Sequence, residues 1–306
     1  MATTLVVLAA TMGNRYGGLK QLEGIGPNGE TILDYSVYDA VKVGFDRIVF
    51  VISKYFEKDF KEKVSDKYKE IVDVEYVYQE VDLVPEDKRN SKRALLWGSA
   101  HAVLMGKPFI NEPFGVINAV NFYQRESFEM LYAQLHKLPN EDFQCFMISY
   151  RLANVIPESG GVTRGICEVN DKEELISVVD HHGVERIGGR AMFLNDYNKW
   201  TELNDDDLVS MNMWGFTPDI FEYLQARFEV FIHTKGMDMK AHFSIPDFIN
   251  EMIVGGLCVK SFETSSKWMG LVSPDDRIQV ILCIGEMIRG GIYPNKLFEP
   301  NLVNDK

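Results

Sequence analysis

The stretch TLVVLAATMGNRYGGLKQL, residues 4–22, joins a short apolar run to a glycine-rich loop. The apolar run reaches residue 10 and is followed by Gly13, which is typical of a buried strand that ends in a loop. Ligands in open α/β sheets bind at the carboxyl ends of strands, so this loop is the first candidate for a binding site. Its glycines let backbone amides approach a ligand, and Arg15 and Lys20 supply positive charge for phosphate oxygens.

The loop matches neither of the two common phosphate-binding patterns. A Walker loop needs a glycine followed directly by Lys-Ser or Lys-Thr, whereas here Leu19 separates Gly18 from Lys20. The spacing of the dinucleotide pattern G-x-G-x-x-G is also absent. The loop alone therefore leaves two interpretations open, a phosphate-binding loop and a flexible surface turn.

Strand and helix patterns alternate over the first half of the chain. We expect strands at 4–10, 46–53, 72–80 and 114–120, and helices at 32–44, 55–71, 97–106 and 125–138. The second half favours hairpin strands within 160–169 and 175–193, a buried strand at 208–216, and helices near 217–229, 245–255 and 275–289. Alternation of this kind predicts an α/β fold, with a Rossmann-like mixed, mostly parallel sheet flanked by helices.

Composition excludes several functional classes. The net charge is −13, and a protein that binds a nucleic-acid backbone needs clustered Lys and Arg, so we expect no nucleic-acid partner. No apolar run is long enough to span a membrane, and the N-terminus lacks the basic region of a signal peptide, so we expect a cytoplasmic protein. The four cysteines are widely spaced without a Cys/His cluster, which favours buried reduced thiols over a zinc site.

The stretch LAATMGNRYGGLKQL and the following residues 26–53 resemble the start of the sugar-1-phosphate nucleotidyltransferase family. WGSAHAVL at 97–104 is similar to the nucleobase loop of that family, and GVINAVNFY at 115–123 to the strand that normally ends in a metal-binding aspartate. GGVTRGICEV and VSMNMWGF look like its sugar-side strands. The resemblance implies the nucleotide-diphospho-sugar transferase type of fold. It also implies one nucleotidyltransferase-like domain over 1–306, with a nucleotide-binding half at about 1–150 and a sugar-side half at about 151–306. Because no linker separates the two halves, the sequence itself favours one mixed-sheet domain with an inserted substrate lid.

The resemblance also implies an activity and a set of site residues. The family transfers a nucleotidyl group from an NTP to a sugar-1-phosphate or a similar phosphomonoester and releases pyrophosphate. Arg15 would hold the triphosphate and Lys20 would steady charge near the α-phosphate, as the catalytic pair. The residues that would contact the nucleotide are Ala9, Ala10, Thr11, Met12, Gly13, Gly98 and Ser99. Asn212 would line the sugar side, and Asp180 would contact sugar hydroxyls.

This chain departs from the family pattern where the chemistry is expected. Thr11 replaces a glycine of the first loop, and Val120 and Asn121 stand where the family has acidic ligands for Mg²⁺. Valine cannot ligate a hard cation, and an amide oxygen is a weaker ligand than a carboxylate. Asp276 is our candidate for a replacement metal ligand. Its alternative role is to complement the dipole of the helix that begins at 275.

Two functions remain open. One is a nucleotidyltransferase with an altered metal site and weakened catalysis. The other is a degenerate member that binds a nucleotide or nucleotide-sugar, or serves as a scaffold, without turnover. We expect Val120→Asp, alone or with Asn121→Asp, to restore activity or metal-dependent NTP binding. The helix near 275–289 can pack on the core or on a second subunit of a homo-oligomer, and we favour the core. We also favour the core for Met213 and Trp214.

Overall fold

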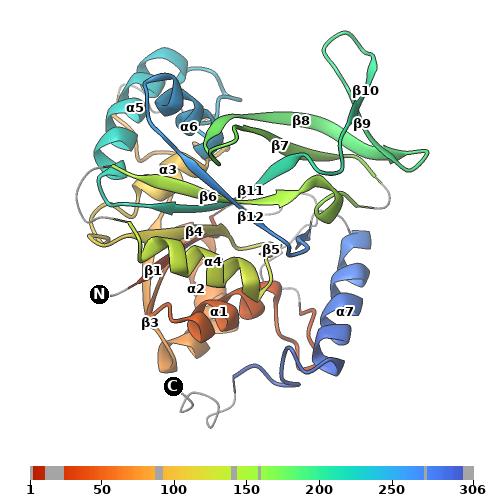
Figure 1. Ribbon diagram of the computed structural model, residues 1–306. Helices are drawn as coiled ribbons and strands as arrows, with labels where there is room; N and C mark the ends of the chain where they lie inside the picture. The colour runs from red at the N-terminus through yellow and green to blue at the C-terminus, as the bar shows by residue number, and fades with distance from the viewer. Residues whose placement is uncertain are drawn as a thin grey trace.

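The computed structural model describes residues 3–10, 24–86, 92–138, 143–157, 160–271 and 274–298 (Figure 1). A mixed sheet forms its centre. β1 (Thr4–Leu8) is hydrogen bonded in parallel to β2 (Arg47–Ile52) on one side and to β4 (Phe114–Asn118) on the other. β3 (Asp73–Tyr78) pairs in parallel with β2 at the edge. The parallel strands expected in the first half are confirmed.

β11 (Leu208–Phe216) joins this parallel block to the second half of the chain. It runs antiparallel to β4, to β6 (Cys145–Arg151) and to β7 (Val162–Val169). β12 (Lys260–Thr264) pairs in parallel with β6. The register between β11 and β6 shifts between Ser210 and Trp214, so the middle of β11 leaves the regular ladder. The predicted mixed sheet is confirmed.

A twisted antiparallel ribbon extends from β7 away from the parallel block (Figure 1). It consists of β8 (Leu175–Ile187), β9 (Arg190–Leu194) and β10 (Trp200–Leu203). Hairpin strands were expected here, although β10 was not. A separate pair of short strands, β5 (Asn121–Phe122) and β13 (Met269–Gly270), lies after the end of β4.

Helices cover both faces of the sheet (Figure 1). The regular helices are α1 (Ile32–Val43), α3 (Ser99–Leu104), α4 (Arg125–Leu135), α5 (Ile220–Lys235), α6 (Ile245–Val254) and α7 (Pro274–Arg289). α1 and α4 pack on one face, while α3, α5 and α6 pack on the other. No helix among the described residues is both long enough and apolar enough to cross a membrane.

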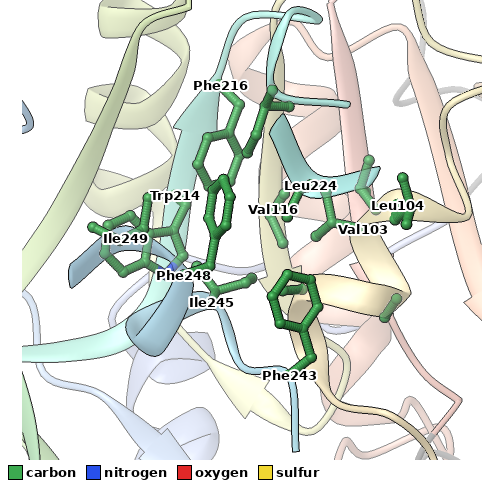
Figure 2. Packing of buried hydrophobic residues seen from close by; sticks show 14 of the residues in the cluster. Val103, Leu104, Val116, Trp214, Phe216, Leu224, Phe243, Ile245, Phe248 and Ile249 are labelled. Atoms are coloured by element: carbon green, nitrogen blue, oxygen red, sulfur yellow. The ribbon is translucent and has the colours of Figure 1, made fainter. Parts of the chain in front are cut away.

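One apolar core lies between β11, α3, α5 and α6. Trp214 and Phe216 of β11 stack on each other, and they pack with Phe248 and Ile245 of α6 (Figure 2). Trp214 is fully buried, and so is Met213, which packs in the cluster on the other face of the sheet. The expectation that these two side chains belong to the core is confirmed.

α1 shows how the local sequence fixes an element beside the site. Thr31 is its N-cap and forms a reciprocal capping box with Asp34, which satisfies backbone N–H groups at the helix start. Gly44 ends the helix in the left-handed conformation, with φ of 116°. The expected end of this helix at Gly44 is confirmed.

Other expectations need correction. The segment expected as one helix at 55–71 is broken into short pieces: 3₁₀ turns at Lys54–Phe56 and Asp66–Glu70, α2 (Glu57–Phe60) and a π turn at Lys61–Ser65. β6 and β12 were not predicted. The first six residues of β6 are all buried, so it lacks the alternation that marks a half-exposed strand.

Candidate active site

The glycine-rich loop leaves the carboxyl end of β1, in the middle of the parallel block. Ala9 and Ala10 are buried just after β1, and the Ala9 amide donates to the Val51 carbonyl. The remaining predicted loop residues, Thr11, Met12, Gly13, Arg15 and Lys20, lie outside the described residues. The described structure therefore fixes where the loop begins, and the roles of Arg15 and Lys20 remain predictions.

A polar cavity of about 320 Å³ opens next to the carboxyl end of β4. Its residues come from β4, β5, β7, β8 and β11, from the starts of α3 and α6, and from the turn before β13. Its lining residues are Ser99, Asn118, Asn121, Thr163, Arg164, Gly165, Asp180, Ser210, Met211, Asn212, Ser244, Pro246 and Trp268. Three residues predicted for ligand binding, Ser99, Asp180 and Asn212, thus meet in one cavity.

Two asparagine amides are locked together in this cavity. The Asn212 Nδ2 donates to Asn118 Oδ1 at 2.9 Å, and the Asn212 Oδ1 accepts from Trp214 Nε1 at 3.0 Å. Asn212 has φ of 62° and lies where β11 departs from its regular register. A left-handed residue within a bulge re-aims a side chain away from the sheet ladder, and here it turns the Asn212 amide toward the end of β4.

Tyr123 fixes the backbone around the end of β4. Its hydroxyl accepts from the Asn118 backbone amide and from Asn121 Nδ2, each at 3.0 Å, and donates to the Met211 carbonyl at 3.0 Å. Burial raises the pKa of Tyr123 above its usual value, so the phenol stays neutral. The sequence did not single out Tyr123, and a tyrosine two residues beyond Asn121 carries no signal of this role.

Arg164 is a buried cation in the cavity wall. Its Nε and Nη2 donate to the Val155 carbonyl at 3.0 and 2.5 Å, and its Nη1 donates to the Thr163 carbonyl at 2.9 Å. The side chain lies over Trp268, with the guanidinium carbon 4.8 Å from the ring centroid. Burial lowers the pKa of Arg164 to about 10, opposed by the carboxylate of Asp276, so the group stays charged at neutral pH.

Comparison with known proteins finds one family that is similar to part of the chain. Residues 20–155 match the family model described as nucleotidyl transferase. Over these residues the chain is similar to the nucleotidyl transferase family. None of the curated protein sequences gives a significant match to this chain.

Solved structures share the fold over nearly the whole chain. The inositol-1-phosphate CTP transferase from T. maritima aligns with a TM-score of 0.60 and 16% identity, covering 94% of this chain and 97% of that one. A protein named as a glucose-1-phosphate thymidylyltransferase from Bacillus anthracis gives 0.61 and 14%, covering 92% and 95%. A UDP-glucose pyrophosphorylase complexed with UDP-glucose gives 0.58 and 18%, covering 94% and 99%. The predicted nucleotide-diphospho-sugar transferase type of fold is confirmed.

The residues at the expected Mg²⁺ position do not fit a divalent cation. Asn121 donates its Nδ2 to Tyr123, and directly opposite it across the β5–β13 pair lies Gly270, which has no side chain. Among the described residues no group of three His, Cys, Asp or Glu side chains is placed to hold a metal ion. Mg²⁺ prefers carboxylates in octahedral geometry, so the amide and glycine found here do not form its site.

The two predicted acidic residues lie in different surroundings. Asp180 lines the cavity from β8, opposite Gly165 of β7, and burial together with the nearby Asp247 raises its pKa. Asp276 is the third residue of α7 and does not line the described cavity wall. Its carboxylate acts on Arg164 instead. The sugar contact for Asp180 and the metal contact for Asp276 both remain predictions.

The predicted base loop is tightly built. Gly98 has φ of 109°, and a Cβ at this position would lie 2.4 Å from the Phe243 carbonyl oxygen. The Gln79 side chain donates to the Gly98 carbonyl at 2.8 Å, and Ser99 Oγ accepts from the Ile245 amide at 2.9 Å. Only glycine fits the first position. Ser99 faces the same cavity as Asn118, which places the loop beside the candidate sugar-side residues.

Proposed function

We propose that this chain binds an NTP together with a sugar-1-phosphate or a related phosphomonoester at the carboxyl edge of its parallel strands, and slowly transfers the nucleotidyl group. The observation that carries the proposal is the cavity beside the end of β4. It unites Ser99 from the predicted base loop with Asn212 and Asp180 from the predicted sugar side. The family match over residues 20–155 supports the same reaction.

In this reaction a phosphate oxygen of the phosphomonoester attacks the α-phosphorus of the NTP. A new P–O bond forms, the bond from the α-phosphorus to the bridging oxygen breaks, and pyrophosphate leaves with that electron pair. Such a transfer needs alignment and neutralisation of charge more than covalent help from the protein. In the proposal, Arg15 and Lys20 neutralise the triphosphate from the loop after β1.

The cavity residues would align the acceptor. Asn118 and Asn212 hold each other, and the described residues offer no partner for the Asn118 Nδ2, which is therefore a donor for a sugar hydroxyl or a phosphate oxygen. Asp180 accepts hydrogen bonds from hydroxyl groups when it is ionised. A cavity with both kinds of group suits a polyhydroxylated phosphate ester. The names of the similar structures make inositol-1-phosphate and glucose-1-phosphate the first acceptors to test.

A second candidate function is binding of a nucleotide or nucleotide-sugar without turnover. The observation in its favour is the pair Asn121 and Gly270, which offers no carboxylate where the resemblance implies a metal. A metal ion usually contributes several kcal/mol to the stabilisation of charge in such a transition state. Loss of that contribution without compensation would leave binding intact and remove catalysis.

Pyrophosphate release separates the two functions. The intact chain is incubated with each common NTP and with inositol-1-phosphate or glucose-1-phosphate, and pyrophosphate is detected by a coupled enzyme assay. The proposal expects slow release that requires both substrates. Thermal stabilisation by an NTP without any pyrophosphate release would favour the binding function. Neither release nor stabilisation by any substrate would overturn both.

A further inference from the structure

The position opposite Asn121 is filled by an aromatic ring. A Cβ built on Gly270 would lie 2.5 Å from the far edge of the Trp268 indole, closer than any ordinary contact. Trp268 is buried, and its backbone amide is held by the Asn154 carbonyl at 3.1 Å. A carboxylate side chain at 270 would therefore require the indole to move. The tryptophan, rather than a metal ligand, occupies this side of the cavity.

The Trp268 indole also packs against the positively charged side chain of Arg164. The Arg164 guanidinium stacks over Trp268, and both residues line the cavity with Asn121. Two backbone carbonyls, those of Val155 and Thr163, fix the plane of the guanidinium. Among the described partners, these bonds use one N–H of each terminal nitrogen and leave the second for a ligand. A guanidinium held in this way is preorganised to bind phosphate oxygens in a bidentate manner.

Arg164 supplies the positive charge of the described cavity lining. It is the only Lys or Arg side chain among the described lining residues, and Asp180 is the only acidic one. Arg164 is 5% exposed, so little water screens a phosphate beside it. The opposing Asp276 carboxylate reduces the net positive potential there.

We propose that Arg164, stacked on Trp268, takes the place of the divalent metal, and that phosphate groups bind in this cavity without a metal ion. The inference rests on the proposed function, because the phosphate belongs to the nucleotide or to the phosphomonoester. It assigns to this chain a site for a phosphate or pyrophosphate group whose charge is balanced by a fixed side chain.

The test uses inorganic pyrophosphate as the probe and isothermal titration calorimetry as the measurement. The full chain is titrated in buffer with EDTA and again with excess Mg²⁺. The variants are Arg164→Met, which removes the charge, and Arg164→Lys, which keeps it. The matched control is Arg190→Met, which changes an exposed arginine at the start of β9. Circular dichroism and the unfolding temperature show whether each variant is folded.

We expect the wild type and Arg190→Met to bind pyrophosphate equally well in EDTA, and Arg164→Met to bind about tenfold or more weakly than Arg164→Lys. Asp276→Asn provides a test that leaves Arg164 in place. If Arg164 is the cation, removal of the opposing carboxylate tightens binding in EDTA. If Asp276 ligates a metal, the same change abolishes Mg²⁺-dependent binding instead.

Binding that appears only with Mg²⁺, or equal affinities of Arg164→Met and Arg164→Lys, would overturn the inference and leave the proposed function standing. A parallel titration with ATP, CTP, GTP, UTP and dTTP tests the proposed function separately from the inference. If pyrophosphate binds in EDTA as expected but no NTP binds under either condition, the inference stands and the proposed function fails.

Discussion

The amide of Asn212 donates to the side-chain carbonyl of Asn118 at 2.9 Å, across the junction of an antiparallel strand with a parallel one. Asn118 is the last residue of β4, and Asn212 lies in the irregular part of β11. This bond ties the strand that carries the sugar-side residues to the strand next to β1. It therefore holds together the two parts of the proposed site.

The first prediction concerns this bond. We expect Asn118→Ala to lower the free energy of unfolding by about 1 kcal/mol, because a half-buried donor on Asn212 loses its acceptor. Asn212→Gly keeps the left-handed backbone conformation and removes the other partner. Urea unfolding of both single variants and of the double variant gives the coupling energy, which we expect at about 0.5–1.5 kcal/mol. Strict additivity would show that the two amides do not support each other.

The second prediction concerns Gly98. We expect Gly98→Ala to cost about 3 kcal/mol or more of unfolding free energy, because it adds both backbone strain and a collision with the Phe243 carbonyl. Gly188→Ala is the matched control. Gly188 also has a positive φ, of 60°, but a Cβ there meets no atom within 4 Å, so only the strain of about 1–2 kcal/mol applies. Equal losses in the two variants would refute the close packing of Gly98 against Phe243.

The third prediction concerns pH. His101 is fully buried, stacks on Phe228, and burial lowers its pKa to about 4. Its ordinary pKa is about 6.5, so between these values the unfolded chain binds a proton that the folded chain excludes. The stability due to this histidine is complete above pH 6.5 and falls by about 1.4 kcal/mol per pH unit as the pH drops toward 4.

Urea unfolding at several pH values between 4 and 7 checks this prediction with His101→Leu. The variant should lose the part of the pH dependence that belongs to His101. His233→Gln, at an exposed position on α5, is the control and should follow the wild type. A wild type and His101→Leu with parallel pH profiles would show that folding does not shift the pKa of His101.

The fourth prediction concerns the missing carboxylates. We expect the double variant Val120→Asp, Asn121→Asp to gain nucleotide binding that strengthens with Mg²⁺, because two carboxylates together with phosphate oxygens can complete a metal site. The measurement is the shift in unfolding temperature by each NTP, with Mg²⁺ and with EDTA. The wild type should respond equally under both conditions. A double variant that ignores Mg²⁺ would show that the cavity around Trp268 cannot admit a metal.

Much of the parallel block was readable from the sequence. The apolar runs of β1, β2 and β4 and the periodic helices α1, α4 and α7 appear at their expected places, since burial on both faces of a sheet and on one face of a helix leaves clear patterns. Val280 and Ile284 of α7 are buried, which agrees with packing on the core, while Ile278 and Leu282 stay exposed. The central strand β6 was missed.

The site was only partly readable. Ser99, Asp180 and Asn212 came from the resemblance, and the cavity brings them together. Asn118 had a usable signal, because a polar residue ends an apolar strand at the ligand-binding edge. Arg164 and Trp268 had none. Their stacking depends on how β7 and the turn before β13 approach each other, and no local pattern encodes that approach.

Together, the proposed function and the role proposed for Arg164 mean that this chain joins a nucleotidyl group to a phosphomonoester without a metal ion. ³¹P NMR tests it most directly, with the chain, each NTP in turn, and inositol-1-phosphate or glucose-1-phosphate, in buffer with EDTA. For at least one pair we expect the signals of a nucleotide diphosphate ester and of pyrophosphate to grow slowly and in equal amounts. Absence of both signals for every pair, or their appearance only after Mg²⁺ is added, would contradict it.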